Sequence, residues 1–370
     1  KLFDYIRKEL PEIVFIGGDI YPSFKNIRNS NDDFFEDLIV FNFEILKKEL
    51  KNNYPFICVI LGNDDETGWR CVRHYFSVFP EAPVSGFIPD ADFPLIYAEK
   101  GITRIFIEGS FDIDNVVSIE GGFRDNMVPD YAKAVLSNPI YAQAFVSFLK
   151  HKGYEGSHEV KDNQLIIKVV GKSAHGSTPQ FGDNAIDRLF EFFIEQKFQG
   201  KLVSLVNDLL IHDIHGHKLG VAYHDDEMGD LTNNFGVIKS TGKTYQIMLN
   251  LRYPNGVQID DVMTKLSSAC EKYGAKVTLD KHQALLYKDP NSELISKLMA
   301  VYQKHTGDYD TKPLNIGGGT FARAMPNCVA FGPHFLDKPT YIHQKNEYIG
   351  IEELLLATTI YTEALYELSK

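Results

Sequence analysis

Three acidic residues that could do chemistry stand directly after a run of apolar residues. Asp64, Asp65 and Glu66 follow residues 56–62, which are typical of a fully buried strand. Acids at the end of a buried strand are costly unless a cation lies there. A metal ion explains them simply, because one carboxylate would bind it and a neighbour would take the proton of a bound water. An acidic loop with a helix N-cap fits this segment equally well.

Four scattered residues could complete such a metal site. Asp19 follows a strand and two glycines, Asp32 precedes a helix, Asp90 lies in a loop, and His343 lies near the end of the chain. Carboxylate and imidazole ligands suit a pair of zinc or manganese ions better than a thiolate structural site. Taken singly, each residue also fits a structural role as a turn residue, a helix cap or an ordinary histidine.

A second set of residues could handle a substrate. The glycine run that contains Gly318, Gly319 and Thr320 offers backbone N–H groups able to cradle a carboxylate. His175, among small residues, could polarise a carbonyl oxygen. Arg252 at a strand end could clamp a substrate carboxylate. The alternatives are a flexible turn, a loop histidine and a surface ion pair.

The strands and helices that must position these residues follow two different patterns along the sequence. Strand and helix patterns alternate in the first hundred residues and again after about residue 287, which predicts a parallel sheet covered by helices. The middle of the chain predicts an α+β domain with an antiparallel sheet. The simplest architecture is therefore an α/β domain interrupted by an inserted α+β domain. The expected strands are 12–16, 56–61, 164–170, 245–252, 275–279 and 327–331, and the expected helices are 34–50, 69–79, 184–194, 260–273, 292–305 and 351–368.

Composition narrows the class of protein. The 370 residues include 38 basic and 50 acidic residues, a net charge of −12, so nucleic acid is not an expected partner. No run of about 18 apolar residues occurs, so no membrane span is predicted, and the N-terminus lacks the apolar core of a signal peptide. None of the four cysteines forms a C-x-x-C pair. Buried free thiols and a reducing, cytoplasmic setting are expected.

Taken together, these motifs resemble the di-zinc peptidase superfamily that includes aminoacylases, carboxypeptidase G and the bacterial dipeptidases. The match is best to the PepV-type, carnosinase-like Xaa-His dipeptidases and covers nearly the whole chain. Besides the acidic motif, the matching segments are 173–180 (SAHGSTPQ), 224–231 (HDDEMGDL), 250–256 (NLRYPNG), 317–320 (GGGT) and 360–368 (IYTEALYEL).

The resemblance implies a role for each matching residue. Residues 1–99 and 287–370 would form the metallopeptidase-like catalytic domain, and residues 100–286 the lid. The implied catalytic residues are Asp65 as the base, Asp19 and the lid residue His175. Asn126, Arg252 and the glycine run would bind the substrate. The implied metal ligands are Asp32, Glu66, Asp90 and His343.

Two departures from the family pattern bear on activity. Gly17 replaces the family's histidine ligand, and Asp65 replaces its glutamate base. An aspartate carboxylate sits about 1.5 Å further back, which matters for proton transfer. We therefore expect one well-held zinc or manganese ion and weak hydrolysis of small dipeptides. The resemblance to the PepV-type also implies a monomer. The alternatives are an inactive peptide-binding or structural protein and an amidohydrolase of acyl-amino acids.

Overall fold

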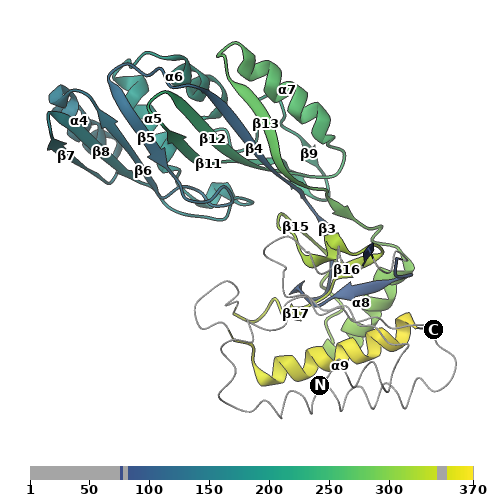
Figure 1. Ribbon diagram of the computed structural model, residues 1–370. Coiled ribbons are helices and arrows are strands. Elements are labelled where there is room, and N and C mark those ends of the chain that lie inside the picture. Colours follow the sequence, from purple (N-terminus) through teal and green to yellow (C-terminus); the bar gives the residue numbers. More distant parts are fainter. Residues whose placement is uncertain (1–75, 78–81, 340–347, 370) are drawn as a thin grey trace. The chain divides into compact units, whose positions relative to one another are not determined.

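The computed structural model of the chain describes residues 76–77, 82–339 and 348–369. The chain divides into two compact units. The split unit comprises Lys1–Glu99 and Leu286–Lys370, and the inserted unit comprises Lys100–Leu285. Both contain strands and helices, which confirms the α/β fold class with an inserted α+β part (Figure 1). The catalytic and lid roles of the two units stay predictions.

The inserted unit is built on an eight-stranded sheet in which every pairing is antiparallel. The strand order is β13-β4-β12-β11-β5-β6-β8-β7, and a separate short hairpin pairs β9 with β10. The strands are β4 (Gly101–Ser110), β5 (Val116–Gly121), β6 (Tyr131–Leu136), β7 (Gly156–Lys161), β8 (Gln164–Val170), β9 (His224–Asp225), β10 (Gly229–Asp230), β11 (Thr232–Ser240), β12 (Thr244–Tyr253) and β13 (Lys276–Gln283).

Helices complete the core of the inserted unit. Ile105 and Ile107 of β4 alternate with half-exposed neighbours, as a sheet covered on one face requires. They share one apolar cluster with Phe190 and Phe193 of α5 and with residues of α6 and α7. The helical elements are η2 (Pro139–Tyr141), α4 (Ala142–Lys152), η3 (Pro179–Phe181), α5 (Ala185–Glu195), α6 (Lys201–Leu205), the π turn η4 (Val206–Leu210) and α7 (Ile259–Glu271).

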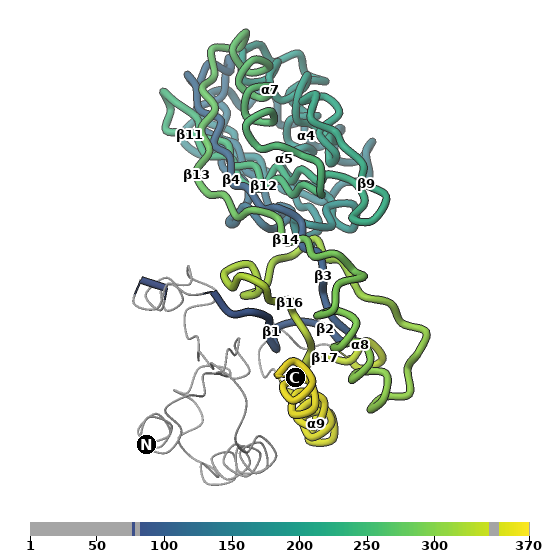
Figure 2. Tube along the Cα trace, turned by 90° about the vertical axis from the view of Figure 1, so that its right-hand side faces the viewer, coloured from purple at the N-terminus to yellow at the C-terminus, as the bar shows by residue number. Residues whose placement is uncertain are grey.

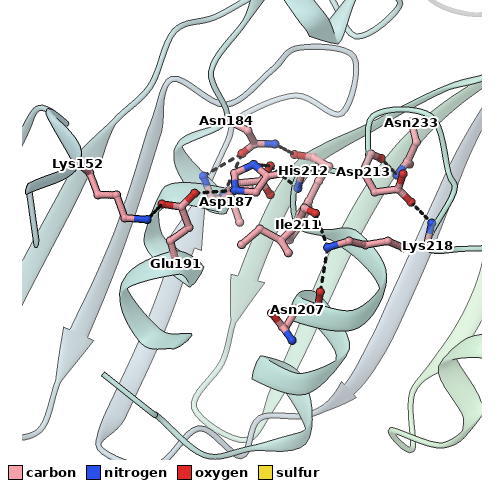
Figure 3. A network of polar contacts seen from close by, with 12 residues as sticks. Lys152, Asn184, Asp187, Glu191, Asn207, Ile211, His212, Asp213, Lys218 and Asn233 are labelled. Carbon is pink, nitrogen blue, oxygen red and sulfur yellow. Dashed lines mark hydrogen bonds and ion pairs between the residues drawn. The ribbon is translucent and has the colours of Figure 1, made fainter. Parts of the chain in front are cut away.

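A network of charged side chains fixes the chain just after η4 (Figure 3). His212 has a φ of 56°, a conformation that L-residues seldom adopt. Its backbone N–H donates to Asp187 Oδ2 over 3.0 Å, and its ring Nε2 lies 2.6 Å from Glu191 Oε1. Lys152 adds an ion pair to Glu191 at 3.2 Å. Contacts with α5 and α4 thus hold a backbone conformation that would otherwise be unfavourable.

The split unit contains a mixed sheet in the order β1-β16-β3-β14, with β15 also paired to β3. The pairs β1 with β16 and β15 with β3 are parallel, whereas β14 and β16 pair with β3 in the antiparallel sense. The strands are β1 (Gly86–Ile88), β2 (Ala91–Asp92), β3 (Ile96–Glu99), β14 (Leu286–Tyr287), β15 (Leu314–Ile316), β16 (Cys328–Ala330) and β17 (Pro333–His334), and the helical elements are α8 (Glu293–Thr306), η5 (Phe321–Ala324) and α9 (Ile351–Leu368).

Helices α8 and α9 lie against each other within the split unit (Figure 2). Glu363 of α9 accepts hydrogen bonds from Lys304 and His305 at the end of α8, each over 2.6 Å. The two described cysteines, Cys270 and Cys328, are buried free thiols, as predicted. In the described part of the chain, no helix combines the length and the apolar character that a membrane crossing requires.

Candidate functional site

Most of the predicted metal ligands lie outside the described residues. This applies to Asp32, Glu66 and His343, and equally to Asp19 and Asp65. Within residues 76–77, 82–339 and 348–369, no three His, Cys, Asp or Glu side chains gather in a way that could hold a metal ion. The proposed ligand set therefore stays a prediction, of which Asp90 is the described member.

Asp90 follows strand β1 and is held in place by the backbone of the helical turn η5. Its Oδ2 accepts a hydrogen bond from the Phe321 N–H over 2.8 Å, and its own N–H donates to the Ile88 carbonyl over 3.0 Å. Carboxylates that bind metals are commonly oriented by such a hydrogen bond. The anchored carboxylate of Asp90 thus fits the role of a hard oxygen ligand for zinc or manganese.

The glycine run leads from strand β15 into η5, and a buried glutamate fixes it there. The N–H of Thr320 donates to Glu99 Oε2 over 3.0 Å, and its hydroxyl also donates to Glu99. Arg323 Nε donates to Glu99 Oε2 over 2.6 Å, and Arg323 Nη2 donates to the Gly318 carbonyl over 2.7 Å. Thr320 therefore donates its hydrogen bonds to a carboxylate of the protein itself. The binding of a substrate carboxylate by Gly318 and Gly319 stays a prediction.

This ion pair is almost completely shielded from water. The side chain of Glu99 is 0% exposed and that of Arg323 is 3% exposed. Burial raises the pKa of Glu99, while the Arg323 guanidinium and the Thr320 donors pull that pKa down. The pair also explains a glycine, because a Cβ on Gly319 would lie 2.7 Å from Arg323 Nε. The run is thus glycine-rich partly because a buried arginine passes close to it.

In the inserted unit, the structure brings Asn126 and His175 together through their backbones. The Gly176 N–H donates to the Asn126 carbonyl over 2.7 Å, and Met127 and His175 form an isolated β-bridge. A Cβ on Gly176 would lie 3.0 Å from the Asn126 carbonyl, so this close approach favours glycine. The His175 ring is exposed, and its Nδ1 lies 2.6 Å from Ser177 Oγ.

Arg252 joins the same group through a side-chain relay. Its exposed fraction is 4%, so the alternative of a surface ion pair is wrong. Its Nε donates to Asn250 Oδ1 over 2.9 Å, and Asn250 Nδ2 donates to Asp125 Oδ2 over 3.0 Å. Asp125 directly precedes Asn126. Three predicted residues, far apart in sequence, are therefore linked within one unit.

The sequence reasoning missed the residues that hold these groups. Glu99 and Arg323 were not among the candidates, although a glutamate directly after the apolar stretch 95–98 was a usable signal. Asp125 and Asn250 were missed as well, although both stand beside predicted residues. Their roles depend on contacts across strands, which spacing along one segment does not reveal.

No protein-family model matches the chain. Among solved structures, the aminoacylhistidine dipeptidase from Vibrio alginolyticus matches with a TM-score of 0.49 and 15% identity, over 97% of this chain and 84% of that chain.

Curated relatives are much more similar in sequence. A "putative dipeptidase" of Staphylococcus aureus strain MW2 is 38% identical over 327 residues, which cover 84% of this chain and 69% of the relative. A "putative dipeptidase" of Staphylococcus epidermidis is 39% identical over the same length and coverage. The chain therefore belongs to the family of these staphylococcal proteins.

Proposed function

We propose that this protein is a metal-dependent dipeptidase that hydrolyses the peptide bond of small dipeptides. The observation that carries the proposal is the 38% identity, over 327 residues, to a relative named as a dipeptidase. The linked arrangement of Asn126, His175 and Arg252 supports it, because these residues bear the groups that would bind a dipeptide's polar atoms. We also propose a cytoplasmic monomer.

The proposed roles follow from the chemistry of each side chain. Arg252 is buried, so its guanidinium meets a substrate carboxylate with little competition from water. His175, exposed on its loop, donates to the oxygen of the scissile carbonyl as negative charge develops there. Asp65 takes the proton of the attacking water and passes it to the leaving amine.

Zinc or manganese, bound by Asp32, Glu66, Asp90 and His343, would polarise the carbonyl and lower the pKa of a bound water. Because Gly17 provides no imidazole, we propose one well-held ion and slow turnover. The shorter side chain of Asp65 acts in the same direction, since it withdraws the base by about 1.5 Å.

The direct test is hydrolysis of a panel of dipeptides, Xaa-His dipeptides included, by the full chain with zinc or manganese. We expect slow cleavage that a chelator abolishes. The variants Gly17→His and Asp65→Glu should each raise the rate, and calorimetry should find one tight site for the metal in the wild type. Cleavage of acyl-amino acids but of no dipeptide, or no cleavage by the wild type and by both variants, would refute the proposal.

A further inference from the structure

A row of polar side chains crosses the central strands of the inserted unit. Asn234 on β11 is the register partner of Asn250 on β12, and Asn250 is the partner of Arg104 on β4. Arg104 Nε in turn lies 2.9 Å from Asp280 Oδ2 on β13. Four neighbouring strands therefore carry polar or charged groups at one level of the sheet.

Asp125 lies over this row and contacts three of its members. Its Oδ2 accepts from Asn250 Nδ2 over 3.0 Å, and its Oδ1 lies 3.6 Å from Arg104 Nη1. Its backbone carbonyl accepts from Asn234 Nδ2 over 2.7 Å, and the same amide donates to the Met127 carbonyl over 2.9 Å. The row thus holds the loop on both sides of Asn126.

Burial along β12 shows where this loop covers the sheet. Gln246 and Met248 are half-exposed, as the outer face of a one-sided sheet should be. Further along the same strand, Asn250 and Arg252 are 3% and 4% exposed. Buried polar groups are costly unless their hydrogen bonds are made, so this local network must keep its geometry.

We propose that Asp125 is the positioning residue that aligns Arg252 with the two adjoining loops that bear Asn126 and His175. The inference rests on the proposed function, which makes these three residues the substrate-binding side of the lid. Asp125 accepts from the Nδ2 of Asn250 and so directs the Oδ1 of that amide toward Arg252 Nε. Through the Asn126 carbonyl and the Gly176 N–H, the same loop fixes the strand segment of His175.

The network can be broken and rebuilt with two isosteric changes. Asn250→Asp places a second carboxylate against that of Asp125 and removes the donor between them, while the acceptor for Arg252 remains. The double variant Asp125→Asn with Asn250→Asp returns one donor and one acceptor to this contact. Repair of the defect by the second change would distinguish a positioning role from a general loss of stability.

Strand β12 also offers a control contact. Gln246 Nε2 donates to Glu108 Oε1 over 2.8 Å, and these residues are also register partners on β12 and β4. Gln246→Glu therefore also sets two carboxylates against each other at strand β12, away from Arg252. We expect it to change kcat/KM less than about twofold.

Relative to the wild type, Asn250→Asp should lower kcat/KM for a dipeptide about tenfold or more. KM should rise because Arg252 is displaced, and kcat should fall because His175 is displaced. The double variant should return to within about threefold of the wild type. Equal activity of Asn250→Asp and the wild type, or a double variant that is folded but no better than the single one, would overturn the inference. If Asn250→Asp does not fold, the double variant is compared directly with the wild type, and a folded double variant whose kcat/KM is more than about threefold lower would overturn the inference.

A measurement without substrate separates this inference from the proposed function. Hydrogen exchange at the Gly176 amide should be faster in Asn250→Asp by about tenfold, unchanged in Gln246→Glu, and slow again in the double variant. If the wild type cleaves no dipeptide, the proposed function fails while these exchange rates still test the role of Asp125. Unchanged exchange at Gly176 in Asn250→Asp would overturn that role.

Discussion

The buried ion pair of Glu99 and Arg323 gives the sharpest prediction for the split unit. Arg323→Met keeps the length and the apolar stem of the side chain but removes its charge. The change leaves Glu99, which is 0% exposed, with the donors of Thr320 but without its cation. It also removes the hydrogen bond to the Gly318 carbonyl. Removal of one partner from a buried pair costs about 3–5 kcal/mol of the free energy of unfolding.

The pH dependence of this loss follows from the raised pKa of Glu99. Burial already raises that pKa in the wild type, and without Arg323 the pKa must rise further. The folded variant then binds a proton that the unfolded chain, with a pKa of about 4.3, has released. Its stability should therefore fall as the pH rises above about 4.3, so the deficit relative to the wild type is larger at pH 7 than at pH 5.

The loss in the free energy of unfolding can be measured by urea unfolding followed by circular dichroism. Hydrogen exchange at the amides of Thr320 and Phe321 would locate the effect. The matched control is Lys297→Ala on α8, where Lys297 and Glu293 form an exposed ion pair at 2.9 Å. That pair should contribute about 0.5 kcal/mol or less. A loss below about 1 kcal/mol for Arg323→Met at pH 7, or one equal to that of Lys297→Ala, would refute the reasoning.

Three further predictions concern single residues. Hydrogen bonds that the His212 ring donates to Asp187 and Glu191 raise the pKa of His212 to about 9, from an ordinary value of 6.5. Its contribution to stability is therefore complete below pH 6.5 and lost as the pH rises through 9. Because 56% of that side chain is exposed, the loss should be about 1 kcal/mol or less, and His212→Gln should abolish this pH dependence in urea unfolding. Gly319→Ala should lower the free energy of unfolding by about 1–3 kcal/mol, whereas Gly318→Ala, whose Cβ would have its nearest neighbour at 3.7 Å, should have little effect in the same thermal melts. His175→Ala should lower kcat for a dipeptide about 100-fold with a small change in KM, and an unchanged kcat would remove His175 from the proposed mechanism.

Local patterns in the sequence predicted some of the described elements, whereas strands β4, β5, β6 and β11 and helix α4 were not expected. The strand expected at 164–170 is β8, and the helix expected at 260–273 is α7, which begins one residue earlier and buries Val262, Leu266 and Cys270. Such elements are predictable because their apolar spacing is set by their own geometry. The expected elements before residue 69 lie outside the described residues and stay predictions.

The supports of the candidate site could not be predicted in the same way. Glu99 and Arg323 are 224 positions apart, and Asn250 and Asp125 are 125 positions apart. No periodic pattern relates residues at such separations, and their pairing depends on which strands become neighbours. The motifs identified Arg252, Asn126 and His175, whereas their connection through Asp125 required the register of β4, β11 and β12.

The two supporting carboxylates, Glu99 and Asp125, lead to one more prediction, which concerns the proposed weak activity. Glu99 holds the glycine run, and Asp125 holds the loop of Asn126, and neither contact involves Gly17 or Asp65. These supports join described residues, whereas the two positions that depart from the family pattern lie outside the described part of the chain. An interaction that acts only in the transition state changes kcat and leaves KM almost constant. Gly17→His and Asp65→Glu should therefore raise kcat while KM stays within about threefold. A fall in KM with constant kcat would show instead that those departures had weakened substrate binding.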